Sequence, residues 1–292
     1  MNFEICKDLS QCGKLWKEFS VNRRLFDVWD FRQCFIDSEY NEPHFIVGYE
    51  KNDVIGIIPL YFDRKLNQHT YCGGWFPERN SFFLKDKTKF AEFLAQCPGN
   101  TFVQGIDPTE NKYYHFLDDE YTYYLDLSKY NYSFEEYFDS FSTKRQKNLR
   151  HDLRSIPDHK IYYNRIEDFE RLVELSNKRY KENSIFNEQL VKNAISRVIS
   201  VADKKGILRM ISLEINGRVE AVDVGILFGE YYYALIGSAN NKVIPNLGKL
   251  MAVLDIKDAI ENKAKFVDFG ATASNWKDKW NLQKDMLLKF VK

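Results

Sequence analysis

A segment with five Lys or Arg side chains and one acidic side chain, Asp152, has the composition of an anion-binding surface. It runs from Ser142 to Pro157, and the N-cap residue at its start and the proline at its end predict a helix between them. The basic side chains could form a platform for phosphate or for a carboxylate-bearing substrate. They could equally be a solvated helix face with no ligand.

The sequence Pro245-Asn246-Leu247-Gly248-Lys249 is predicted to enter a helix directly after a strand and a short loop. The free N–H groups and the dipole of a helix start attract anions, and a glycine there lets a phosphate approach the backbone closely. Gly248 could also serve only to let the helix pack tightly against a strand, so both interpretations stay open.

A third group begins where Asp268-Phe269-Gly270 ends a predicted strand and a Lys- and Trp-rich segment follows. An acid and a glycine at a strand end, followed by such a loop, are typical of the rim of a ligand site. Trp276 and Trp280 are spaced i, i+4, however, and could instead anchor a short helix in the core.

Two predicted β-hairpins divide the chain into similar halves. One has its turn at Lys51-Asn52-Asp53 and the other at Asn216-Gly217, and Glu50 and Glu214 then align at an offset of 164 residues, 214 minus 50. Predicted helices lie at about 9–19, 25–36, 87–96, 166–180, 188–202 and 246–262, and predicted strands at 45–49, 54–60, 101–105, 121–127, 208–215, 219–228, 231–237, 266–269 and 286–290. The alternation predicts an α/β protein with mixed α+β sheets, divided into an N-terminal domain (1–128), a linker with the basic helix (129–157) and a C-terminal domain (158–292).

Composition narrows the function classes. Lys plus Arg and Asp plus Glu both number 42, so no global field favours nucleic acid or an anionic membrane. The longest strongly apolar stretch, Val54 to Phe62, is far shorter than the ~20 residues of a membrane-spanning helix. Five cysteines without a C-x-x-C pair, and histidines without ligand spacing to them, indicate free thiols and no metal site. We therefore expect a cytoplasmic protein.

The order of these elements resembles the GNAT acyltransferase fold, and the C-terminal half is similar to the Fem-type, BioF2-like acetyltransferase family. The basic helix matches the family pattern skk-R-x-n-L-R-r-x-L over Ser142 to Leu153. Asp268-Phe269 and Trp276-Lys277-Asp278-Lys279-Trp280 match its closing pattern at the right spacing. The resemblance covers about residues 134–280, and it implies two tandem GNAT-like domains, the N-terminal one degenerate.

The resemblance implies an N-acyltransferase that moves an acyl group, from acyl-CoA such as acetyl-CoA, to a small-molecule or peptide amine. The catalytic candidates are Asp223 as general base and Tyr232 or Tyr233 as the acid that protonates the leaving group. The donor would lie along Gly237 and Ser238, with its phosphates at Asn246, Leu247, Gly248 and Lys249. Arg145, Arg150, Asp268 and Lys277 would bind the acceptor or another anionic substrate.

Two alternatives stay open. Fem-type relatives use aminoacyl-tRNA, and lysyl-phosphatidylglycerol synthases share a related tandem fold. Lys, Arg and aromatic residues do not interleave outside 142–154, so we expect no nucleic-acid partner other than a tRNA donor. The family often has an acid where this chain has Ala273-Ser274-Asn275, and the helix start supplies a single glycine. Both departures favour a catalytically silent module that binds a ligand or partner.

Overall fold

The computed structural model describes residues 1–271 and 276–292, and the chain forms two compact units. Of the described residues, the N-terminal unit comprises Met1–Thr122, Ala271 and Asp285–Lys292, and the C-terminal unit comprises Tyr123–Gly270 and residues 276–284. The division between the two units falls after Thr122, and the basic helix lies in the C-terminal unit. The reason is packing, because Leu149 of that helix is fully buried in the core of the C-terminal unit.

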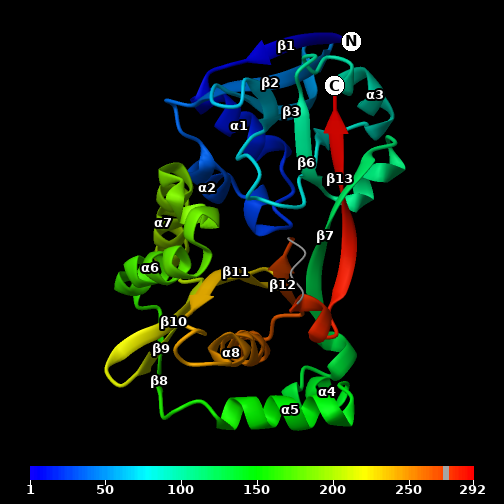
Figure 1. Ribbon diagram of the computed structural model, residues 1–292. Helices are drawn as coiled ribbons and strands as arrows, with labels where there is room; N and C mark the ends of the chain where they lie inside the picture. Colours follow the sequence, from blue (N-terminus) through cyan, green and yellow to red (C-terminus); the bar gives the residue numbers. More distant parts are fainter. Residues whose placement is uncertain (272–275) are drawn as a thin grey trace. The chain divides into compact units, whose positions relative to one another are not determined.

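The N-terminal unit is built on an antiparallel sheet in the order β1-β2-β3-β4, with β5 paired to β3 (Figure 1). The predicted hairpin is present as β2 and β3, and its turn residue Lys51 has a φ of 55°. The predicted helix at 25–36 is shorter, because Val28 has extended backbone angles and leaves only α2 between two 3₁₀ turns. The elements are β1 (Asn2–Cys6), α1 (Leu9–Phe19), α2 (Trp29–Arg32), β2 (Asn41–Glu50), β3 (Asp53–Asp63), β4 (Gln68–Tyr71), β5 (Phe83–Leu84), α3 (Phe90–Leu94) and β6 (Phe102–Ile106).

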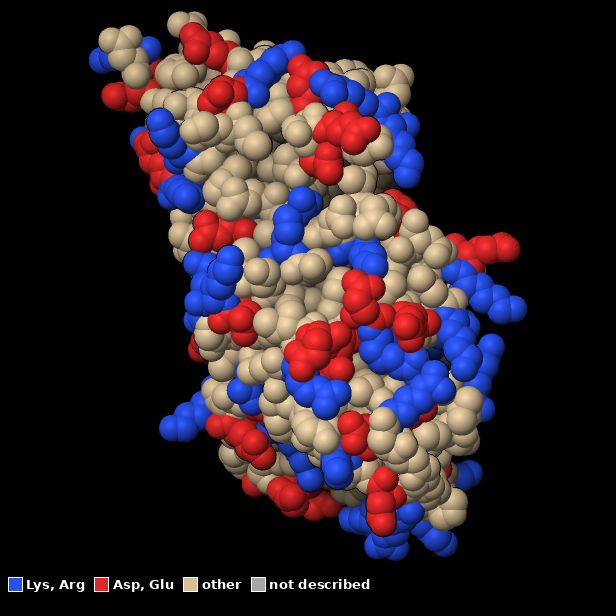
Figure 2. Space-filling model, turned by 90° about the vertical axis from the view of Figure 1, so that its left-hand side faces the viewer, with Lys and Arg blue, Asp and Glu red and all other residues tan. Residues whose placement is uncertain are grey.

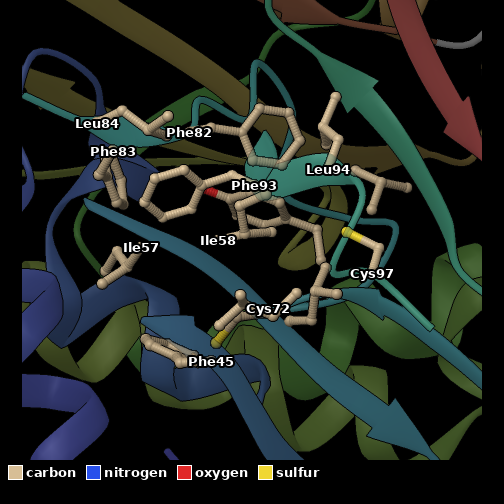
Figure 3. Packing of buried hydrophobic residues seen from close by; sticks show 14 of the residues in the cluster. Phe45, Ile57, Ile58, Cys72, Phe82, Phe83, Leu84, Phe93, Leu94 and Cys97 are labelled. Atoms are coloured by element: carbon tan, nitrogen blue, oxygen red, sulfur yellow. The ribbon is translucent and has the colours of Figure 1, made fainter. Parts of the chain in front are cut away.

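Aromatic and aliphatic side chains from these strands and helices form the core of the N-terminal unit (Figure 3). Trp16 of α1 is fully buried, and its ring meets the ring of Phe83 edge-on at 4.9 Å between centroids. All five cysteines lie within the described ranges and are free thiols. The unit is therefore held by apolar packing without disulfides, as its cysteine spacing predicted.

The C-terminal unit contains a mixed sheet in the order β7-β12-β11-β10-β9-β8. Only β11 and β12 run parallel, whereas the other neighbouring strands run antiparallel. Figure 1 shows α6 and α7 over one face of this sheet and α8 against the other. The elements are β7 (Leu117–Asp126), which belongs to this unit from Tyr123 on, α4 (Phe134–Asp139), α5 (Thr143–Arg154), β8 (Lys160–Tyr163), α6 (Phe169–Tyr180), α7 (Gln189–Lys204), β9 (Leu208–Ile215), β10 (Arg218–Phe228), β11 (Tyr231–Ala239), α8 (Leu247–Glu261) and β12 (Phe266–Gly270). The last strand, β13 (Gln283–Val291), pairs with β6 and belongs from Asp285 on to the N-terminal unit.

The hairpin of β9 and β10 turns at Asn216 and Gly217, which both have positive φ, at 51° and 76°. This turn type matches the twist of the two strands and confirms the predicted hairpin. It places β10 in the middle of the sheet, where α8 packs against it. Within residues 1–271 and 276–292, every helix is too short or too polar to cross a lipid bilayer.

Candidate active site

A pocket of about 420 Å³ lies in the C-terminal unit where β11 and β12 separate. β12 pairs with β11 only from Tyr231 to Tyr233, whereas β10 pairs with β11 as far as Ala239. Among the described strands, residues 234–239 of β11 therefore have a paired neighbour on one side only, and most of them line the pocket. The other lining residues are Arg179, Tyr180, Asp223, Asn241, Pro245, Asn246, Gly248, Lys249, Ala252, Asp255, Phe269, Trp276 and Trp280.

Asp223 of β10 is a partly exposed pocket residue that lies over its neighbour on β11, Gly237. A Cβ atom on Gly237 would lie 1.8 Å from Oδ1 of Asp223, far inside van der Waals contact. The glycine thus provides the space that the carboxyl group occupies. Asp223, the predicted base, and Gly237, a residue predicted to lie against the donor, are therefore adjacent in the structure.

A second carboxyl group, that of Asp255 on α8, completes the acidic part of the pocket. Asp255 is 3% exposed, and it lines the same pocket as Asp223. The hydroxyl of Tyr232 donates to Oδ1 of Asp255 over 3.0 Å. Gly225 makes room for this tyrosine, since a Cβ there would lie 2.4 Å from the Tyr232 hydroxyl oxygen.

Burial is the main reason why the pKa values of both carboxyl groups are raised. It raises the pKa of Asp223 well above the ordinary value, and the adjacent Asp255 raises that pKa further, against the attraction of Arg179. Burial also raises the pKa of Asp255 to about 7, although hydrogen bonds from Tyr232 and Asp223 oppose the rise. A carboxyl pair with such pKa values retains a proton near neutral pH and can exchange it with a ligand.

The predicted tyrosines lie behind or beside the pocket rather than in its lining. Tyr232 is fully buried, and Tyr233 is 7% exposed with its ring stacked on that of Tyr231 at 5.6 Å. Ser238, by contrast, lines the pocket and is 2% exposed, and its hydroxyl has no hydrogen-bond partner within the part of the chain that the structure describes. A buried hydroxyl of this kind is a polar group that a ligand can satisfy.

The predicted phosphate-binding helix start borders the pocket, but its polar groups are already paired within the protein. The Gly248 N–H donates to Oδ1 of Asn241 over 3.0 Å. The Lys249 ammonium lies 2.6 Å from the Asp152 carboxylate and also donates to the side chain of Asn246. Leu247 packs its side chain into the core, so only its backbone is available to a ligand.

Aromatic rings form another part of the pocket lining. Trp280 is 3% exposed and packs beside Phe141, whereas Trp276 is 38% exposed and lies edge-on to Phe269. Trp280 is thus a core anchor, whereas Trp276 is partly exposed to solvent at the rim of the pocket. Ala273, Ser274 and Asn275, where the family often has an acid, lie outside the described residues.

Asp268 and Lys277 hold the end of β12. Asp268 accepts a hydrogen bond from the Gly270 N–H at 2.8 Å, and the buried Lys277 ammonium donates to the Gly270 carbonyl at 2.9 Å. Neither side chain belongs to the pocket lining. A role for them in binding the acceptor is not apparent from these contacts.

The basic helix α5 presents most of its Lys and Arg side chains to solvent. Arg150 is exposed over the ring of Phe138, whereas Arg145 is half-buried, with its guanidinium 5.8 Å from the ring centre of Trp280. On the face of the molecule in Figure 2, basic and acidic side chains are interspersed rather than separated. This face therefore carries no broad single-sign field for a polyanion.

Sequence analysis missed Asp255 and Arg179. Asp255 lies on a helix for which only an apolar stripe was evident, yet α8 is buried on several sides and places Asp255 and Asp258 against the sheet. The signal that could have identified Asp255 is the presence of acidic residues in an otherwise apolar helix. Arg179 is an exposed residue at the end of α6, and nothing in its spacing indicated that α6 borders the pocket.

Comparison with known proteins now adds to this geometry. Residues 143–278, slightly under half the chain, match the family model described as an acetyltransferase (GNAT) domain. The C-terminal unit is therefore similar to a GNAT domain. The match begins at the first residue of α5 and ends beyond β12, so it includes the whole sheet edge and helix that form the pocket. A comparison with curated protein sequences finds no match.

Solved structures share the fold over nearly the whole chain. FemX is similar with a TM-score of 0.61 and 12% identity, over 99% of this chain and 97% of that chain. L-PGS from Bacillus licheniformis is similar with a TM-score of 0.58 and 10% identity, over 97% of this chain and 90% of that chain. A tandem GNAT protein from the clavulanic acid biosynthesis pathway has a TM-score of 0.56 and 8% identity, over 99% of this chain and 98% of that chain. At these identities the comparisons show the fold alone, and they confirm the predicted tandem GNAT fold.

Within the described ranges, no group of three or more His, Cys, Asp or Glu side chains has the arrangement of a metal site. The pocket lining offers carboxyl, hydroxyl, guanidinium and backbone groups. Such groups suit proton transfer and charge stabilisation during acyl transfer.

Proposed function

We propose that the GNAT domain is an N-acyltransferase that moves an acyl group from a thioester or ester donor to an amine in the pocket between β11 and β12. The observation that supports this most directly is the carboxyl group of Asp223, which lies in the pocket beside the stretch of β11 that is paired with β10 alone. A base beside backbone groups that can hold a carbonyl is the arrangement that aminolysis needs.

In the proposed reaction, the amine nitrogen attacks the donor carbonyl and forms the new C–N bond. The C–S or C–O bond to the leaving group then breaks. Asp223 takes the proton that the amine loses, and the backbone N–H groups that face the open edge of β11 within residues 234–239 are the candidates to stabilise the oxyanion. The protonated Asp223 then returns this single proton to the leaving group, so the products are an amide and a thiol or alcohol.

Tyr232 takes a different role in this proposal from that of a direct acid. Its hydroxyl is bonded to Asp255 and its ring is fully buried, so it acts as a positioning residue for the carboxyl pair. Tyr233 also lies outside the pocket lining, with its ring against Tyr231. A proton for the leaving group would come from the carboxyl pair or from solvent in the pocket.

Acyl-CoA is the first candidate donor because its phosphates could bind the start of α8 after displacing the internal partners there. An aminoacyl ester of tRNA is the second candidate, and one observation favours it. Gly248 and Lys249, the residues expected to hold a pyrophosphate, are already bonded to Asn241 and Asp152. A donor without a pyrophosphate would leave these bonds intact.

The experiment is calorimetric titration of the full-length protein with acetyl-CoA, free CoA and an aminoacyl-tRNA. We compare the wild type with Gly248→Glu, which places a negative charge at the helix start, and with Gly248→Ala as the matched control. Gly248 has ordinary backbone angles, and a Cβ there would meet Asn241 no closer than 3.2 Å.

Acetyl-CoA binding that is lost in Gly248→Glu and kept in Gly248→Ala would support acyl-CoA as the donor. Binding of aminoacyl-tRNA alone would replace acyl-CoA by the second candidate. Binding of a donor without transfer to any amine in an acceptor screen would favour a silent module and contradict the proposed activity. Absence of binding for all three would contradict the donor site itself.

A further inference from the structure

We propose that Cys6 and Cys12 form an oxidisable dithiol, a modification site at which a small disulfide compound converts the two thiols into one intramolecular disulfide bond. Both residues lie in the N-terminal unit, Cys6 at the end of β1 and Cys12 in α1. The proposal therefore concerns a different part of the chain from the pocket, and it does not depend on the proposed acyl transfer.

The two sulfur atoms are already in contact. The Cys12 thiol is directed at Cys6, since its Sγ lies 3.5 Å from Sγ of Cys6 and 3.5 Å from the carbonyl oxygen of the same residue. A disulfide bond is about 2.05 Å long, so the two sulfur atoms have to approach each other by roughly 1.5 Å. Cys34, by contrast, directs its thiol at the carbonyl oxygen of Asp30 over 3.2 Å.

The connection between β1 and α1 is where this approach can take place. Only Lys7 and Asp8 separate the last residue of β1 from the first residue of α1, and both are exposed. β1 is also an edge strand, because among the described strands it pairs with β2 alone. A small shift at such an edge disturbs fewer buried contacts than a shift inside the core.

The two thiols differ in their access to solvent, and this difference decides the order of events. Cys6 is half-buried, whereas Cys12 is fully buried. Burial, together with the adjacent Cys6, raises the pKa of the Cys12 thiol, so Cys12 is a poor nucleophile toward a reagent in solution. Cys6 is therefore the thiol that meets the oxidant, and Cys12 reacts only through Cys6.

The oxidation is a thiol–disulfide exchange in two steps. Cys6, as the thiolate, attacks one sulfur of the small disulfide, whose S–S bond breaks and releases one thiol. Cys12 then loses its proton and attacks Sγ of Cys6, so that the mixed disulfide breaks and the second thiol leaves. The two protons lost by the cysteines end on the two released thiols, and the two electrons given up by the cysteines reduce the small disulfide.

The new bond ties the edge strand β1 to the N-terminal part of α1. α1 packs against β2 and β3, and its Trp16 is fully buried in the core. A cross-link that the folded state favours stabilises the folded state by the same factor, because oxidation and folding form a thermodynamic cycle. We therefore expect the redox state of the surroundings to change the stability of the N-terminal unit.

The test incubates the folded, full-length wild type with a mixture of oxidised and reduced glutathione at pH 8 and maps the disulfides by digestion and mass spectrometry. We expect one disulfide, between Cys6 and Cys12, that dithiothreitol reverses. Its equilibrium constant should be at least about tenfold larger in the folded protein than in urea, because the fold holds the two sulfur atoms together. The oxidised protein should then be more stable by at least about 1.4 kcal/mol, the equivalent of tenfold.

Three variants assign a role to each thiol. Cys12→Ala should stop at the mixed disulfide and carry one glutathione on Cys6, because the second attacking thiol is missing. Cys6→Ala should take up no glutathione at Cys12. Cys97→Ala, which removes another buried thiol from the same core (Figure 3), should form the disulfide between Cys6 and Cys12 as the wild type does.

The wild type alone can overturn the inference, so the test does not depend on the folding of a variant. A folded wild type that forms no disulfide would overturn it, and so would a disulfide between Cys12 and Cys72, which lies in the same core. An equilibrium constant equal to that in urea would overturn it as well, because the fold would then contribute nothing. Glutathione on Cys12 in Cys6→Ala would overturn the assignment of Cys6 as the attacking thiol.

Discussion

The carboxyl group of Asp223 occupies the space that a side chain at residue 237 would need, and Gly237 therefore shapes the pocket as directly as the acid itself. A Cβ atom on Gly237 would lie 1.8 Å from Oδ1 of Asp223. The two residues face each other on β10 and β11. A glycine opposite an acid in the middle of a sheet marks a position where the backbone makes room for a functional group.

Gly237→Ala should displace the Asp223 carboxyl group while leaving the fold intact, because the backbone angles of Gly237 suit any residue. We expect the rate of acyl transfer to an amine to fall at least tenfold, because Asp223 then no longer holds the position of the base. Gly99→Ala is the matched control, since a Cβ there meets nothing within 4 Å. An unchanged transfer rate in Gly237→Ala would show that the carboxyl position is not important.

Asp255→Asn should make the stability of the folded protein less sensitive to rising pH. The folded-state pKa of Asp255 is raised from 3.8 to about 7, so the folded state binds more protons than the unfolded state between these values. Stability therefore falls as pH rises through this window, by at most about 4 kcal/mol at about 1.4 kcal/mol per pKa unit. The melting temperature of the variant relative to wild type should rise from pH 5 to pH 8. A constant difference would refute this.

The ion pair of Arg209 and Asp258 supports α8 next to the carboxyl pair. Asp258 is 1% exposed, and Arg209 donates two hydrogen bonds to its carboxylate. Arg209→Met should lower the free energy of unfolding by about 3 kcal/mol in urea, because it leaves a buried carboxylate unpaired. Arg209→Met combined with Asp258→Leu should recover most of this loss. If Arg209→Met alone were as stable as the wild type, water would have to reach the Asp258 carboxylate.

Arg32 is a buried cation at the centre of the N-terminal unit. It is 1% exposed and donates to the carbonyls of Phe26 and Cys72 and to the side chain of Asn80. Arg32→Met should destabilise the protein by about 3 kcal/mol, because these acceptors lose their donor. Arg64→Met, at an exposed arginine, should change stability by less than about 0.5 kcal/mol. Equal losses of stability in Arg32→Met and Arg64→Met would contradict a special role of Arg32 in the core.

Local signals were sufficient to predict the hairpins and most helices. Asn216-Gly217 determines its own turn, and the alternating strands on either side follow from it. Asp223 could be singled out because an acid interrupts an apolar strand. Gly237 and Gly248 line the pocket, and a glycine near a strand end or in the first turn of a helix is visible in the sequence itself.

Other features depend on contacts between distant residues, which spacing does not reveal. Asp255 is 32 residues from its partner Asp223, and its burial depends on how α8 packs against β10. The pairing of Lys249 with Asp152 joins two segments that the sequence presented as separate anion sites. Their opposite charges satisfy each other, and this is why the expected phosphate site is less open than its sequence indicated.

The most direct test of the account is acetyl transfer from acetyl-CoA to a panel of primary amines, followed by mass spectrometry of the amide product. The account predicts an amide product with the wild type and a rate at least about 100-fold lower with Asp223→Asn, the scale of a general base. Glu261→Gln should match the wild type. An amide product whose rate is unaffected by Asp223→Asn would contradict the assignment of Asp223 as the base, and the absence of product with every amine would contradict acyl-CoA-dependent transfer to amines.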